Sequence, residues 1–221
     1  MASQRHRGPS LYRAIPPARC AVVSEPDWRT LLIEAARRDV ETRTRLASSG
    51  ELLNGYHPEM EAVHNANADL LESVMNAIGW PGRHALGDEG ASAAFLIIQH
   101  AIARPALQRR ALALMLDAIP EGQANALDAA YLSDRIAIFE GSEQTFATQF
   151  DWDATGQLSP GPTRDVATLD ERRASVGLPP IADSIAEMRV NAAAEGECAP
   201  VDLSQRRAEF EAWARRVGWR A

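Results

Sequence analysis

One histidine inside an apolar helical stretch is the side chain of this sequence best suited to proton transfer. Gln99 and His100 are the only strongly polar residues between positions 93 and 102. A buried polar group without a partner costs about 1–3 kcal/mol, so each of these two residues needs one. An imidazole changes its charge near neutral pH, which suits His100 to general acid/base catalysis. The alternative is a core histidine that bonds a backbone carbonyl.

A second group of side chains has the spacing of one helix face. Tyr131, Asp134 and Arg135 recur at i, i+3 and i+4, so a helix presents them together. We expect Asp134 to orient His100. We expect Arg135 to hold a substrate carboxylate or phosphate, because a guanidinium binds such anions through two parallel hydrogen bonds. The alternative is an exposed face, or a structural ion pair with residues 144–149.

The polar residues after position 143 supply hydrogen-bonding groups but no nucleophile beside a base. In an extended segment side chains alternate, so Gln144 and Thr148 point to one side and Gln149 to the other. Arg172 either closes an anion site or, as one of two adjacent arginines, faces the solvent. The expected catalytic residues are His100, Asp134 and Arg135. The expected substrate-binding residues are Trp80, Gln99, Tyr131, Gln144, Thr148, Gln149 and Arg172.

His57, Glu61 and His64 have a spacing that could bind a metal ion. At i, i+4 and i+7 a helix aligns all three, and Glu61-x-x-His64 is the motif of carboxylate-bridged di-metal bundles. Those bundles repeat the motif on a second helix, and this chain has no second copy. Pro58 also places His57 at the start of the helix and not inside it. We therefore expect no metal and no other cofactor.

The composition excludes several classes of function. All 23 basic residues are arginine, so Schiff-base chemistry and a P-loop lysine are excluded. The net charge of −7 argues against a general nucleic-acid binder. Cys20 and Cys198 are too far apart in sequence for a CxxC metal motif. No apolar run approaches the roughly 18 residues of a membrane span, so we expect a cytoplasmic protein without membrane contact.

Helices must position these side chains, because alanine is abundant and capping and stop signals recur along the chain. We expect a mainly α, single-domain helical bundle of about six or seven helices with one small β-hairpin. The hairpin turns at residues 151–156, after an extended segment at 144–150. The signals mark helical segments at residues 25–48, 58–78, 88–103, 105–119, 123–140, 165–176, 181–194 and 203–217.

Three regions are expected along the chain. Residues 1–23 form a flexible N-terminal arm, residues 24–194 a helical core domain, and residues 195–221 a linker and a C-terminal amphipathic helix. That last helix carries an apolar stripe, which predicts docking on the body of the protein or on a second copy in a homodimer. The stripe consists of Leu203, Phe210, Ala214 and Val217, with Trp213 at its edge.

Short motifs in the middle of the chain follow the order and spacing of one bacterial family. They include Gly79-Trp-Pro81, Leu86-Gly-Asp-Glu89, Ile98-Gln-His100, Gln108-Arg-Arg110, Tyr131-Leu-Ser-Asp-Arg135, Thr148-Gln149 and Gly177-Leu-Pro-Pro180. Over about residues 70–182 the chain resembles the family catalogued as domain of unknown function 6624. The resemblance implies a shared fold and a shared pocket, but no established reaction. The chain departs from it at Ile102, where the family usually has an acidic residue, and at Phe146-Ala147, where it usually has Tyr-Gly.

These residues favour a cofactor-independent enzyme that uses His100 for general acid/base chemistry. We expect a small polar or anionic substrate and a hydrolase or lyase reaction, by hydrolysis, elimination or cyclisation. The rival hypothesis is a non-catalytic binding or protein-interaction module in which the same residues form a buried polar network. A concave pocket shared by His100 and Arg135 favours the enzyme, whereas a sealed core histidine favours the module.

Overall fold

The computed structural model describes residues 26–51 and 56–221, so the predicted N-terminal arm lies outside the described residues. The described part contains eight α-helices and one two-stranded antiparallel sheet. This confirms the prediction of a mainly α single domain with one small hairpin, although the helices number eight instead of six or seven. No helix in this part of the chain is both long enough and apolar enough to cross a membrane.

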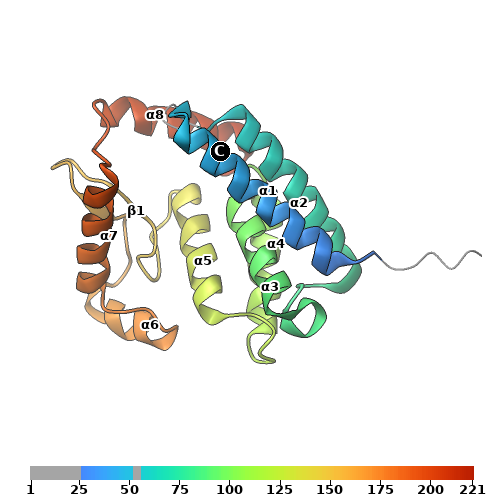
Figure 1. The fold of residues 1–221 in the computed structure, drawn as a ribbon. Helices are drawn as coiled ribbons and strands as arrows, with labels where there is room; N and C mark the ends of the chain where they lie inside the picture. Colours follow the sequence, from blue (N-terminus) through green and yellow to red (C-terminus); the bar gives the residue numbers. More distant parts are fainter. Residues whose placement is uncertain (1–25, 52–55) are drawn as a thin grey trace, which may run out of the picture.

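Five helices build the larger part of the molecule. They are α1 (Trp28–Ser48), α2 (Pro58–Ile78), α3 (Arg83–His100), α4 (Pro105–Ala118) and α5 (Ala126–Glu140). The first two lie side by side, and α3 packs against both of them, while α4 packs on α5 (Figure 1). Each α-helix buries one face in a shared core. Its largest buried apolar side chains include Leu32, Leu71, Met75, Ile97, Ile98, Met115 and Leu132.

The third helix differs from its predicted bounds at both ends. It begins at Arg83, five residues before the predicted start, and contains a break at Gly87 with φ 67° and ψ 175°. A positive φ of this size is accessible to glycine at little cost, so the chain can turn there and continue as a helix. The helix ends at His100, which places this side chain at its C-terminus.

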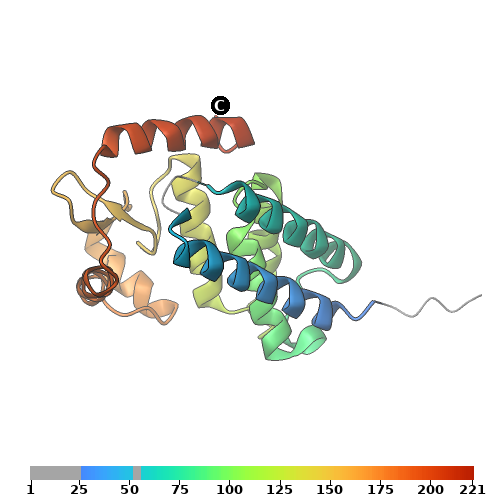
Figure 2. The same cartoon turned by 45° about the horizontal axis from the view of Figure 1, so that its top comes forward.

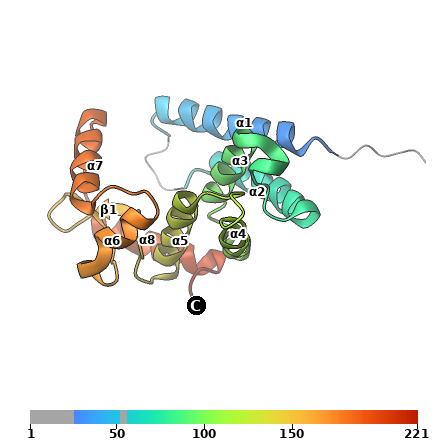
Figure 3. The same cartoon turned by 90° about the horizontal axis from the view of Figure 1, so that it is seen from below.

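The segment between α5 and α8 lies on the other side of α5 from α4 (Figure 1). This segment contains a hairpin of β1 (Phe150–Trp152) and β2 (Leu158–Pro160), followed by the helices α6 (Leu169–Ser175) and α7 (Ile181–Glu195) (Figure 3). The predicted hairpin is confirmed, but the extended segment before it is not. Between Gln144 and Gln149 the backbone bends, and Ala147 has a φ of 54°, so side chains do not alternate.

The last helix docks on the body of the protein. Helix α8 (Leu203–Val217) crosses the end of α5 (Figure 2), and the ring of Phe139 packs at 5.1–5.9 Å from those of Phe210, Trp213 and Trp219. Beyond the helix, Trp219 is 4% exposed, and its Nε1 donates a hydrogen bond of 2.7 Å to the carbonyl oxygen of Ile102. The C-terminal segment therefore completes the core.

Removing this segment is expected to destabilise the fold. A chain that ends at Pro200 loses the aromatic cluster, so its Tm in circular dichroism should fall. The milder variant Trp219→Ala should lose about 3–5 kcal/mol, which corresponds to a Tm lower by roughly 10 °C. Val201→Ala is the control, because this side chain is exposed. Equal melting of all four chains would show that α8 is not docked in solution.

Candidate functional site

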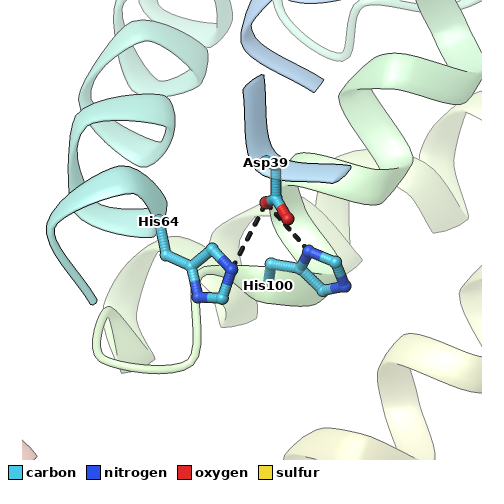
Figure 4. Close-up of side chains that lie close together, drawn as sticks. All are labelled: Asp39, His64 and His100. Atoms are coloured by element: carbon cyan, nitrogen blue, oxygen red, sulfur yellow. Dashed lines mark hydrogen bonds and ion pairs between the residues drawn. The ribbon is translucent and has the colours of Figure 1, made fainter. Parts of the chain in front are cut away.

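A buried carboxylate links three helices at the centre of the site. Asp39 of α1 is 0% exposed, and its Oδ2 lies 2.9 Å from Nδ1 of His100 and 3.3 Å from Nε2 of His64 (Figure 4). His64 comes from α2, and His100 is the last residue of α3. The three side chains, which we call the Asp39 cluster, therefore meet where α1 packs on α2 and α3.

The sequence analysis missed Asp39, although the sequence contains a signal for it. On α1 the buried residues Leu32, Ala35 and Ala36 recur at helical spacing, and Asp39 continues that face three and four residues later. His64 lies on the buried face of α2 in the same way, four residues before Ala68. A charged residue on an apolar helix face must be paired, and here the pairing partners are the two imidazoles.

The two histidines keep the Asp39 carboxylate ionised. Burial by itself would raise the pKa of Asp39, but its contacts with the imidazoles of His100 and His64 hold that pKa well below its usual range. An ionised carboxylate only accepts hydrogen bonds, so Nδ1 of His100 donates to Oδ2. This bond fixes the ring orientation and leaves Nε2 as the second nitrogen of His100.

Tyr56 contacts the imidazole of His64 through a hydrogen bond and a stacking interaction. The Tyr56 hydroxyl lies 2.7 Å from Nδ1 of His64, and the two rings stack at 5.6 Å. Burial, and then the negative charges of Glu61 and Asp39, raise the pKa of Tyr56 well above its usual value, so the phenol stays protonated. Tyr56 also meets the edge of Trp213 at 6.4 Å, which connects the Asp39 cluster to α8.

The Asp39 cluster opens onto a cleft of about 860 Å³. His64, His100 and Arg135 all line it, so the two residues that sequence analysis placed in one pocket share this cleft. Ile102, which stands where the resembling family usually has an acid, lines it as well. The side chain of His100 is 26% exposed, and it is therefore not a sealed core histidine.

Arg135 brings a positive charge to the cleft. Its Nη1 donates a 2.7 Å hydrogen bond to the backbone carbonyl of Gln99, while its buried Nε has no partner among the described residues. Burial lowers the pKa of Arg135 to about 10, so the group is still charged at neutral pH. No carboxylate in the described part of the chain forms an ion pair with it, which leaves it available to an anion.

Asp134 does not occupy the position that we expected. Its two oxygens accept hydrogen bonds of 2.8–3.1 Å from the backbone N–H groups of Thr145, Phe146 and Thr148, and from the Thr148 hydroxyl. The carboxylate that contacts His100 is Asp39. The expectation that Asp134 orients His100 is therefore wrong, because the loop after α5 uses both Asp134 oxygens.

Most of the predicted substrate-binding residues hold this loop together. The Gln144 side chain donates to the carbonyl and accepts from the N–H of Gln149, at 3.0 and 2.7 Å. The Gln149 amide donates to Thr148, and Arg172 donates to the carbonyl of Thr145 at 2.9 Å. None of these four side chains lines the cleft beside the Asp39 cluster.

The remaining predicted residues are spread over the molecule. Trp80 lines a different cavity, of about 200 Å³, and Tyr131 is exposed. Gln99 is buried, and its backbone carbonyl, not its side chain, contacts Arg135. His57 caps the N-terminus of α2, as predicted, and accepts a hydrogen bond from the N–H of Glu59.

One departure from the resembling family lies in this loop. The φ of 54° at Ala147 lies in the left-handed region, where glycine is preferred over residues with a Cβ. The family usually has glycine at this position. Here the residue is alanine, and the buried Arg173 donates hydrogen bonds to the carbonyls of Phe146 and Ala147.

We predict that Asp134→Asn reduces stability and does not act through the cleft. The substitution replaces an acceptor oxygen by an NH₂ group that faces backbone donors, which should cost about 2–3 kcal/mol in urea denaturation. Asp88→Asn is the matched control, because its surface ion pair with Arg83 contributes little. A loss no larger than that of the control would contradict the role assigned to Asp134.

Comparison with known proteins places the chain in a family without identifying a reaction. No curated protein and no solved structure matches the chain significantly. The model of a family of unknown function, domain of unknown function 6624, matches residues 31–194. This range is longer than the resembling stretch found from motifs, and it includes Asp39, His64, His100 and Arg135. Because the match covers well over half of the chain, the protein belongs to this family of unknown function.

Proposed function

We propose that this protein is an enzyme that performs acid/base chemistry on a small polar or anionic molecule in the cleft. The observation that carries the proposal is the bond between the buried Asp39 carboxylate and His100, in a cleft that Arg135 also lines. The reaction is of hydrolase or lyase type, that is hydrolysis, elimination or cyclisation. The proposed setting is the cytoplasm, and the proposed partner is a small-molecule substrate.

His100 is the proposed proton acceptor and donor. With its Nδ1–H bonded to Asp39, the ring presents Nε2 on the side away from the carboxylate (Figure 4). A carboxylate behind an imidazole fixes the tautomer and stabilises the imidazolium that forms when Nε2 takes a proton. The same nitrogen then returns the proton to a leaving group. Asp39 acts through His100 and is a positioning residue.

The charges around the cleft support the proposed substrate class. Its volume of about 860 Å³ lies within the range of about 300–1,000 Å³ that is typical of small-molecule sites. Arg135 offers a half-buried cation, and Arg43 adds an exposed one. Glu195 and Glu197 also line the cleft, so a substrate that carries hydrogen-bond donors as well as an anionic group suits it best.

The rival function is a non-catalytic binding or interaction module. Its support is the network of Asp134, Gln144, Thr148 and Gln149, whose polar groups bond one another and the backbone. That network lies away from the Asp39 cluster and explains none of its contacts. The enzyme is therefore the better supported proposal.

The test of His100 is a comparison of matched variants. The full-length protein, His100→Gln and His84→Gln are each incubated with a panel of small carboxylates, esters and phosphate esters, and consumption is followed by mass spectrometry. Loss of a general acid/base costs about 10²–10⁴ in rate, so His100→Gln should lose at least about 100-fold. His84 is exposed and lies outside the cleft, so its variant should match the original protein. Unchanged turnover by His100→Gln contradicts the proposal.

Arg135→Lys should weaken anion binding while leaving the fold intact. A single ammonium cannot reproduce the fork of a guanidinium, so affinity for inorganic phosphate or citrate should fall by about 10-fold in calorimetry. Arg37→Lys is the control, because Arg37 is an exposed residue of α1 outside the cleft. Equal affinities for all three proteins would remove Arg135 from the site.

A further inference from the structure

We propose that Asp39, His64 and His100 bind one divalent transition-metal ion. One ligand atom from each residue lies within 4.8 Å of the others, and the three side chains come from three different helices. This set differs from His57, Glu61 and His64, which the sequence spacing offered, and shares only His64 with it. Ion binding itself is independent of the proposed function, whereas its consequence for catalysis rests on that function.

The distances within the Asp39 cluster fit a metal coordination shell. With metal–ligand bonds of about 2.0–2.1 Å, the ligand atoms of a tetrahedral site lie about 3.3 Å apart. Oδ2 of Asp39 lies 2.9 Å from Nδ1 of His100 and 3.3 Å from Nε2 of His64. Small side-chain movements therefore bring all three atoms into bonding distance of one ion.

Two buried atoms of the Asp39 cluster lack a hydrogen-bond partner. Among the described residues, neither Oδ1 of Asp39 nor Nε2 of His64 forms a hydrogen bond, and both atoms are inaccessible to solvent. Nε2 of His64 approaches the carboxylate without hydrogen-bond geometry. In the tautomer of His64 with its proton on Nδ1, the Nε2 lone pair faces the carboxylate oxygen, and a metal ion between them satisfies both atoms.

The Tyr56 hydroxyl can accept a hydrogen bond from the His64 tautomer that metal binding needs. When Nε2 of His64 is a ligand, the proton of the neutral ring is on Nδ1, and Nδ1 then donates to the Tyr56 oxygen at 2.7 Å. Histidine ligands almost always donate their second N–H to such a partner, which orients the ring. The stacking of Tyr56 on His64 holds the ring from the same side.

The ligand set identifies the class of metal and of site. Two imidazoles and one carboxylate are typical of catalytic zinc sites and of non-haem iron sites, both of which keep positions open for water or substrate. Here the open side is the cleft, which His64 and His100 line. One carboxylate and two neutral imidazoles leave a divalent ion with a net positive charge, which adds to that of Arg135 in attracting an anion.

A bound ion changes which group acts as the base. The ion replaces the proton between Nδ1 of His100 and Asp39, so Nε2 of His100 carries a proton and donates a hydrogen bond into the cleft. A bound ion would lower the pKa of its water, and the hydroxide left after that water gives its proton to the solvent would be the base. The cleft, the substrate class and the role of Arg135 stay as proposed.

The test is metal titration of the intact, EDTA-treated protein in the absence of substrate. We expect Co²⁺ to bind at one ion per chain with visible d–d absorption, and Zn²⁺ to displace it. His64→Ala and Asp39→Ala should weaken binding by more than about 100-fold, since even partners of ligands contribute about 10–100-fold. His57→Ala and His84→Ala are the matched controls and should bind like the original protein, because neither residue belongs to the Asp39 cluster.

Tyr56→Phe keeps the test decisive if removal of Asp39 unfolds the chain. This variant retains the stacked ring and loses only the hydroxyl, so circular dichroism should be unchanged while metal affinity falls by about 10–100-fold. The inference is overturned if the original protein binds no stoichiometric Co²⁺ or Zn²⁺, or if His64→Ala binds as well as His57→Ala. Such a result would leave the acid/base role of His100 standing, whereas absence of turnover would leave the metal site standing.

Discussion

A negative charge in the interior of the helical bundle is the constraint on which the site depends. Asp39 is fully buried, and an unpaired carboxylate in such a place would cost several kcal/mol or take up a proton. His64 and His100 prevent both outcomes by meeting the same oxygen from two other helices. The pairing therefore sets how α1, α2 and α3 lie relative to one another at the cleft, because a shift of any one of them breaks it.

Residues around the Asp39 cluster hold its two histidines in place. Tyr56 holds His64, and α8 covers the Tyr56 ring through Trp213. Trp219 donates to the carbonyl of Ile102, two residues after His100, and so fixes the end of α3. Arg135 reaches the same place from α5 by its bond to the Gln99 carbonyl. Elements from both ends of the chain thus converge on one cleft.

The sequence predicted those features that local patterns determine. The positions of most helices and the docking of α8 follow from apolar spacing and capping residues, and the structure confirms them. His100 and Arg135 were noticed because a polar group in an apolar stretch and a guanidinium on a helix face are visible locally, and both line the cleft. The apolar spacing of α1 indicates that Asp39 is buried, but no local pattern indicates its pairing with His100, which is 61 residues away.

The partners of Asp134 in the loop after α5 were likewise not predictable from local sequence patterns. The i, i+3, i+4 spacing correctly places Asp134 beside Arg135 on one helix, but it does not say what the face meets. In the structure that face meets a loop whose backbone donors use the carboxylate, and the left-handed turn at Ala147 is what brings them there. Turn conformations of this kind depend on tertiary contacts. The prediction of an extended segment with alternating side chains at residues 144–150 was therefore wrong.

The tautomer of His100 provides the most direct test of the buried Asp39 charge. Imidazole ¹⁵N chemical shifts of the metal-free protein, recorded beside Asp39→Asn, report which ring nitrogen carries the proton. An ionised Asp39 that accepts from Nδ1 predicts a protonated Nδ1 in the original protein and a changed shift in Asp39→Asn. An unprotonated Nδ1 at neutral pH, with shifts that the substitution leaves unchanged, would contradict the pairing on which the proposed site is built.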